Sequence, residues 1–141
     1  MLQITRPVKG DFFITNGYFG SSQWYKIHKA IDVKTKCAEY PNGIGRPILS
    51  VFTGDYITHG FSTNGGNYIW IRHESRIEAR YYHLAKVEQQ AGWTTRFMGN
   101  LIGYSGNTGK WTTGAHLHLE FWKRGIQLDP EPYFFNYIKN L

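Results

Sequence analysis

Alternation of apolar and polar residues is the clearest pattern in this chain, and it predicts β-strands. Along residues 67–73 the alternation is strict, with Ile69, Ile71 and His73 on one face and larger polar or aromatic side chains on the other. Comparable alternation or short apolar runs recur elsewhere. The predicted strands cover residues 27–33, 48–52, 67–73, 77–84 and 116–122.

Glycine-rich and proline-rich stretches separate these segments and predict turns. Residues 61–66 hold an Asn-Gly-Gly signal that predicts a hairpin, and Gly54 is expected to begin another turn. Sixteen glycines and 17% aromatic residues fit an all-β domain of short strands. Residues 1–27 are expected to be irregular and residues 129–141 to form a short cap. The chain 1–141 is therefore predicted to be one domain.

Composition narrows the function classes. The 141 residues suffice for a core that buries ~68% of the unfolded surface. Cys37 is the only cysteine, so an internal disulfide is excluded. No stretch approaches the ~20 apolar residues of a membrane span, and the start has no signal-peptide pattern. The net charge of +6 favours an anionic partner such as nucleic acid or an acidic cell wall. Its scattered distribution favours a solvated surface over a nucleic-acid patch.

Histidines supply the strongest candidate chemistry. In residues 116–122 the period of two sends His116 and His118 to one face and the leucines to the core. Two imidazoles on one strand face can serve one metal ion, although a polar outer face also carries histidines by chance. His28 and Asp32 fall on one side of an extended segment, and both side chains suit zinc.

His83 completes the set of candidates. The alternation of residues 77–84 places it on the face of Ile77, Ala79 and Tyr81, where a lone histidine is typical of a satisfied core residue. A His-Asp-His set nevertheless supplies the three protein ligands of a catalytic zinc site, and two further histidines could transfer protons or stabilise an oxyanion.

The ordered motifs make the chain resemble the M23 (lysostaphin- and LytM-like) peptidoglycan endopeptidases, from about Pro7 to Tyr133. The segments that carry the resemblance are HKAID at 28–32, RPILSVFTGD at 46–55, GGNYIWIRH at 65–73, YYHL at 81–84 and IGYSGNTGKWTTGAHLHLEF at 102–121. They include the family's HxxxD motif, its YxHL histidine and its closing HLHxE signature, in the family's order.

The resemblance implies a role for each candidate. His28, Asp32 and His118 would hold one Zn²⁺ per chain, while His83 and His116 would act on the metal-bound water and the developing oxyanion. Which of the two is the general base stays open. The substrate would be a peptide bond of peptidoglycan cross-bridges or stem peptides, either glycyl-glycine or a bond involving D-alanine.

Other positions depart from the pattern or match no catalytic position. Ala30 stands where the family usually has glycine. Tyr18 and Tyr25 are alternative candidates for an oxyanion tyrosine. His59 and His73 are expected to be structural or surface residues, and Cys37 is expected to be incidental.

The resemblance further implies a mainly β fold: a single compact antiparallel-sheet domain, like the duplicated hybrid motif, with long groove-lining loops. Residues 33–47 and 85–101 are the expected groove walls. The protein is expected to be a monomer that acts on peptidoglycan outside the cell or in the periplasm. Without a signal peptide, it would be virion-associated in a phage or a domain of a longer protein. The alternative is an inactive M23-like binding or regulatory module that activates other wall hydrolases.

Overall fold

The computed structural model describes residues 2–18, 20, 28–88 and 94–137. Within them the chain forms ten β-strands and one short 3₁₀ helix. None of the described helices is long and apolar enough to cross a membrane. The elements are β1 Ile14–Asn16, β2 Ile31–Val33, β3 Pro47–Leu49, β4 Gly54–Ser62, β5 Gly66–Arg72, β6 Ile77–Val87, β7 Thr95–Arg96, β8 Leu101–Ser105, β9 Leu117–Lys123, β10 Ile126–Leu128 and η1 Glu131–Phe134.

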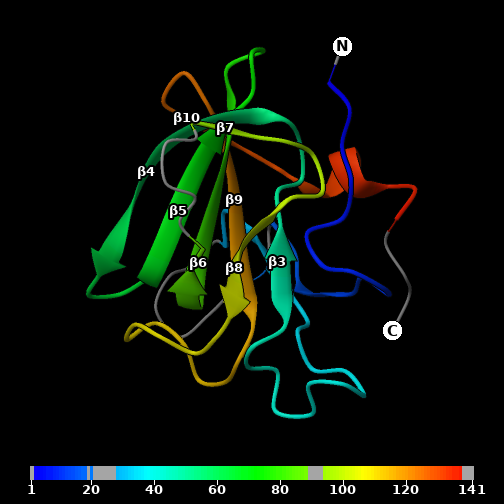
Figure 1. Cartoon of the computed structure of the whole chain (residues 1–141), viewed down its shortest axis with the longest axis vertical. Coiled ribbons are helices and arrows are strands. Elements are labelled where there is room, and N and C mark those ends of the chain that lie inside the picture. The colour runs from blue at the N-terminus through cyan, green and yellow to red at the C-terminus, as the bar shows by residue number, and fades with distance from the viewer. Residues whose placement is uncertain (1, 19, 21–27, 89–93, 138–141) are drawn as a thin grey trace.

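All strand pairings are antiparallel, and the main sheet follows the order β1-β2-β9-β6-β5-β4-β7. Figure 1 shows the long strands β4, β5, β6 and β9 side by side. β6 pairs with β9 through residues 77–82 and then with β8 through residues 84–87, and β8 in turn pairs with β3. The predicted mainly β, antiparallel fold is confirmed.

The core lies against one face of this sheet, as the alternation predicts. On β5 the inward residues Ile69 and Ile71 are buried, and on β9 Leu117, Leu119 and Phe121 are buried. The intervening residues of both strands are only half-buried. The opposite face of the sheet is therefore free to carry functional side chains.

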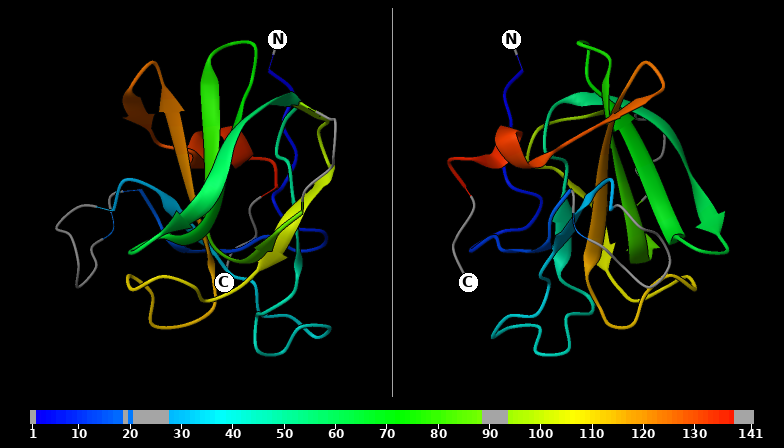
Figure 2. Two further views of the ribbon diagram at one scale, coloured as in Figure 1. Left: turned by 60° about the vertical axis from the view of Figure 1, so that its left-hand side comes forward. Right: turned by 180° about the vertical axis from the view of Figure 1, so that it is seen from behind.

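The two ends of the described chain meet on the core. Phe134 of η1 packs edge-to-face on Phe12, with ring centroids 5.2 Å apart, and the Tyr137 hydroxyl donates to the Ile4 carbonyl at 3.2 Å. Figure 2 shows this cap beside the N-terminal segment. The expected irregular stretch 1–27 contains one strand, β1, and the domain limits 1–141 stay a prediction.

Three expectations about strands were wrong in detail. Gly54 begins no turn, because it opens the nine-residue strand β4; a Cβ there would lie 2.5 Å from the Arg72 carbonyl oxygen of β5, so the position requires glycine for close approach. The strand expected at 48–52 is β3, Pro47–Leu49; residues 50–52 are buried but lie outside any strand. Residues 101–105 form the strand β8, although glycine-rich sequence favours turns. The hairpin predicted at 61–66 joins β4 to β5.

Candidate active site

Pairing of β2 with β9 brings the first two site residues together. Asp32 lies directly opposite His118, and Ile31 and Val33 on either side lie opposite Leu119 and Leu117. Those four apolar side chains are all buried, so the core fixes the register of the pair. Asp32 and His118 consequently face outward together, although they are 86 positions apart.

His83 reaches the same face through a β-bulge. Two residue steps on β5, Asn67 to Ile69, lie opposite three on β6, Tyr81 to Leu84. His83 has φ 65°, and its amide donates to the Gly65 carbonyl at 2.7 Å. Leu84 therefore takes the core-facing place. The prediction that His83 lies on the core face of β6 was wrong.

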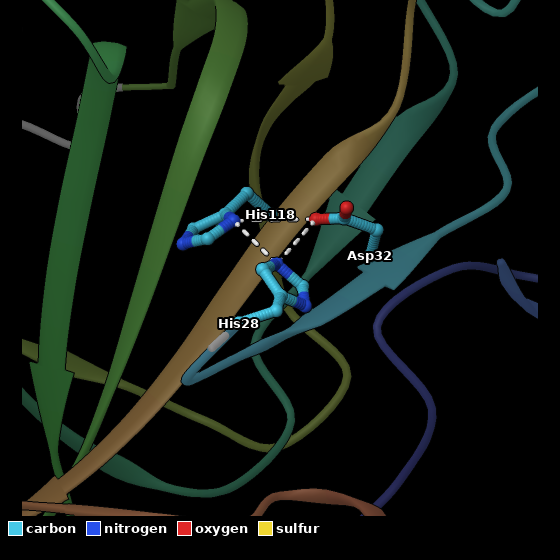
Figure 3. A group of neighbouring side chains, drawn as sticks. All are labelled: His28, Asp32 and His118. Carbon is cyan, nitrogen blue, oxygen red and sulfur yellow. Dashed lines mark hydrogen bonds and ion pairs between the residues drawn. The ribbon is translucent and has the colours of Figure 1, made fainter. Parts of the chain in front are cut away.

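The ligand atoms of three side chains converge (Figure 3). His28 Nε2 lies 3.3 Å from Asp32 Oδ1 and 3.3 Å from His118 Nδ1, and His118 Nδ1 lies 3.2 Å from Asp32 Oδ1. Zinc bonds of ~2.0–2.1 Å in tetrahedral geometry place neighbouring ligand atoms ~3.3–3.4 Å apart. The triangle therefore has the size of one face of a zinc tetrahedron.

Each histidine of the site has its second ring nitrogen occupied by an acceptor, which fixes the tautomer. Main-chain carbonyls take the Nδ1–H of three of them: Gly17 for His28 at 2.9 Å, Thr108 for His83 at 2.7 Å and Gly114 for His116 at 2.8 Å. His118 instead places Nε2 2.9 Å from Oε2 of Glu120. His28 Nε2 and His118 Nδ1 are therefore the nitrogens that face Asp32 Oδ1, and each can ligate a metal ion in its deprotonated form.

His116 and His83 border the triangle. His116 Nε2 lies 3.4 Å from Asp32 Oδ1, and the His83 ring centroid lies 4.9 Å from that of His116 and 5.8 Å from that of His118. Among the described residues, only His28, Asp32 and His118 form a group whose ligand atoms all lie within 4.8 Å of one another. His116 lies beside that group without belonging to it.

Burial and charge shift the pKa values in opposite directions. Burial alone raises the pKa of Asp32, but hydrogen bonds with three imidazoles outweigh it and hold that pKa far below its usual range. Burial alone lowers the pKa of His118, but hydrogen bonds with Asp32 and Glu120 outweigh it and raise the pKa to about 9. Burial lowers the pKa of His83 to about 4 despite its bond to Thr108, so His83 is neutral at pH 7.

A pocket of about 350 Å³ opens beside the site. Its lining comes from Lys29, Ser62, Asn64, Gly65, Tyr82, His83, Trp111, His118, Glu120 and Gln127. The expected walls, residues 33–47 and 85–101, supply none of these, and residues 89–93 lie outside the described part of the chain. The lining comes instead from the β4–β5 hairpin, β6, the loop before β9, β9 and β10, together with Lys29.

The remaining candidates lie around this arrangement. The Tyr18 hydroxyl donates to the Gln127 carbonyl at 3.4 Å, at the rim of the pocket, and Tyr25 lies outside the described residues. His73 is buried edge-on against Phe52, with centroids 5.5 Å apart, which fits the expected structural role. His59 contacts Tyr56 on β4.

Glu120 and Trp122 belong to the site, although the sequence interpretation gave them no role. The Trp122 indole Nε1 donates to Glu120 Oε1 at 2.7 Å, and Glu120 Oε2 faces His118. The signal was present in the sequence: both residues follow His118 at intervals of two along a predicted strand, and hence share its face.

Comparison with known proteins identifies the family to which the chain belongs. Residues 26–130 match the sequence profile of "Peptidase family M23". The chain belongs to this family. The peptidoglycan DD-endopeptidase ShyC of Vibrio cholerae is 34% identical over 105 residues, which are 74% of this chain and 22% of that protein.

Two solved structures are similar in fold. A zinc-containing peptidase from Vibrio cholerae has a TM-score of 0.75 at 29% identity, covering 92% of this chain and 39% of the other. The catalytic domain of the prophage-encoded M23 protein EnpA from Enterococcus faecalis has a TM-score of 0.72 at 25% identity, covering 90% and 95%. The chain spans about a fifth of the length of the curated relatives that it matches.

Proposed function

We propose that this chain is a zinc-dependent endopeptidase that hydrolyses peptide bonds in bacterial peptidoglycan. Membership of the M23 family and the likeness to a zinc-containing peptidase support the proposal. The observation that carries it is the triangle of His28 Nε2, Asp32 Oδ1 and His118 Nδ1, whose edges of 3.2–3.3 Å suit one zinc ion.

His28, Asp32 and His118 would hold the ion, with one carboxylate oxygen and two neutral imidazoles as donors. Zinc held there would lower the pKa of a water molecule and polarise the carbonyl of the scissile bond. Asp32 is ionised at neutral pH, because its pKa is held far below the usual range. His116 and His83 lie beside this triangle, with His116 Nε2 3.4 Å from Asp32 Oδ1.

His116 and His83 would handle protons and charge. Each donates its Nδ1–H to a main-chain carbonyl, so Nε2 is the ring nitrogen that each could use for proton transfer. His116 Nε2 lies closer to the ligand atoms, at 3.4 Å from Asp32 Oδ1, and can hold a proton in hydrogen-bonding range of that oxygen. His83 is buried and neutral, which suits an orienting partner. The assignment of the base between the two stays a prediction.

The site of action would be the cell wall or periplasm. The relative ShyC is named a peptidoglycan DD-endopeptidase, which supports a stem-peptide bond involving D-alanine over a glycyl-glycine bond. EnpA is prophage-encoded, which supports a phage-associated setting. Mass spectrometry of the products from purified walls of two chemotypes, one with glycine cross-bridges and one with direct cross-links, distinguishes the two bonds.

Zinc content and wall lysis test the proposal together. The purified protein should contain about one zinc per chain, lose lytic activity on chelation and regain it with Zn²⁺. His118→Ala should abolish zinc binding, whereas His116→Ala should keep zinc and lose about 10²–10⁴-fold in activity. His59→Ala, a histidine replacement on β4, is the matched control and should change neither.

The alternative is an inactive module that activates other wall hydrolases. A folded protein that holds no zinc, lyses no wall and still stimulates a partner hydrolase would refute the enzyme and establish the module. Equal loss of zinc in His116→Ala and His118→Ala would refute the division of roles alone.

A further inference from the structure

His118 differs from the other histidines of the site in what holds its second nitrogen. The other three donate to main-chain carbonyls, whereas His118 donates to the side chain of Glu120 at 2.9 Å. A main-chain carbonyl remains as an acceptor when the side chain of its residue is replaced. The position of a side-chain acceptor such as the Glu120 carboxylate depends on the rotamer of that side chain. The orientation of His118 can therefore depend on residues beyond its direct partner.

Glu120 is itself held in place by Trp122. The indole Nε1–H donates to Glu120 Oε1 at 2.7 Å, so each carboxylate oxygen serves one N–H donor. His118, Glu120 and Trp122 alternate along β9 and share its outer face. If the bond to Oε1 were lost, the carboxylate could rotate, and Oε2 would no longer be directed at His118.

The ring of Trp122 is fixed in turn by a cation stacked upon it. The Arg80 guanidinium lies 4.4 Å from the Trp122 ring centroid and 3.7 Å from that of Trp70, and thus contacts both indoles. Arg80 is ion-paired with Glu78 at 2.9 Å, which holds the guanidinium over β6. The indole N–H of Trp122 is consequently aimed by contacts that involve β6 as well as β9.

We propose that Trp122 is a positioning residue for His118: its indole N–H holds Glu120, and Glu120 presents His118 Nδ1 to the metal ion. Trp122 itself touches neither the ion nor the substrate. The inference rests on the proposed function only in taking that ion to be zinc.

Zinc affinity of the folded apo protein is the test, measured by competition with a chromophoric chelator. Trp122→Phe keeps a ring against Arg80 but removes the N–H donor, and should raise the zinc Kd by about threefold to tenfold, while Glu120→Gln should raise it by about 10–100-fold. Trp70→Phe is the matched control: it removes an indole N–H stacked on the same Arg80, but one that donates to Tyr82 at 3.1 Å. Its zinc Kd should stay within about twofold of wild type.

A double variant separates positioning from general weakening of the sheet. Because Trp122 acts through Glu120, Glu120→Gln with Trp122→Phe should bind zinc about as weakly as Glu120→Gln alone. The visible spectrum of the cobalt-loaded protein should shift in Trp122→Phe and not in Trp70→Phe. Glu120→Gln keeps every ring, and so gives a second measurement if Trp122→Phe folds poorly.

Three results would overturn the positioning role: an unchanged zinc Kd in Trp122→Phe, an equal loss in Trp70→Phe, or losses that add in the double variant. A wild-type protein that binds no zinc would instead overturn the proposed function. The two failures are therefore distinguishable.

Discussion

Zinc binding to the metal-free protein should release one proton near neutral pH, and His118 should be its source. Burial alone lowers the pKa of His118, but the hydrogen bonds with Asp32 and Glu120 raise it to about 9. At about pH 7 the metal-free site therefore holds an imidazolium, with Nδ1 directed at Asp32 Oδ1, 3.2 Å away, and Nε2 at Glu120. Nδ1 must lose its proton before it can ligate zinc.

The magnitude follows from the difference between the pKa and the pH. With a pKa of about 9, roughly half of His118 is in the ligating form at about pH 9 and roughly 1% at about pH 7. The apparent zinc Kd at about pH 7 should therefore be roughly 50-fold weaker than at about pH 9. Chelator competition at several pH values in this window measures the slope. Calorimetry at about pH 7 in two buffers with different ionisation enthalpies counts the released protons directly.

Glu120→Gln provides the control, because it removes one of the two carboxylates that raise the pKa of His118. Its plot of log Kd against pH should level off at a lower pH than that of the wild type. A zinc Kd that is constant between about pH 7 and pH 9, with no proton released, would show that His118 is already neutral and that the electrostatic reasoning is wrong.

Further predictions concern His83 and the loop that supports it. His83→Asn should keep the melting temperature within about 5 °C, because Asn tolerates φ of 65°, and should lose about 10²-fold or more in wall lysis. Burial lowers the pKa of His83 to about 4, so as the pH falls below about 6.5 this residue takes up a proton in the unfolded chain before it does so in the folded one. Between about pH 6.5 and pH 4 the metal-free wild type should therefore lose up to about 3 kcal/mol more free energy of unfolding than His83→Asn does. Urea titrations at two pH values measure this difference. Gly109→Ala should lower the free energy of unfolding by about 1–3 kcal/mol, since φ is 91° and the new Cβ would overlap the Asn64 carbonyl. Gly114→Ala meets nothing within 4 Å and should change it by less than about 0.5 kcal/mol; equal losses would contradict the steric argument.

Of the long strands, β5, β6 and β9 could be predicted from sequence because their alternation records burial directly, whereas β4 was not predicted. Ile69 and Ile71 on β5, and Leu117 and Leu119 on β9, are all buried as their period of two requires. The short strands could not be predicted this way. β8 contains glycine, and it exists because β3 and β6 offer partners on both of its sides, which no local pattern reveals.

The site was predictable in its members but not in its contacts. Asp32 and His118 meet because β2 inserts beside β9, and periodicity within one strand says nothing about which strand lies next to it. Residue type and spacing supplied the five residues as candidates, and the ordered motifs gave each its role through resemblance. The role of Glu120 needed both the register and the indole of Trp122, since only the folded strand shows that one carboxylate bridges the two side chains.

His83 shows most clearly how a correct residue can follow from an incorrect placement. Strict alternation along β6 puts it with Tyr81 in the core, where it would have no access to the other site residues. The bulge adds one residue to β6, returns Leu84 to the core and turns His83 outward. It requires a positive φ at His83, a conformation that residues other than glycine rarely adopt. Such backbone conformations persist only where surrounding contacts hold them, and here Gly65 and Thr108 accept hydrogen bonds from the main chain and ring of His83. The irregularity that defeats the periodic prediction is therefore the feature that brings His83 to His116 and His118.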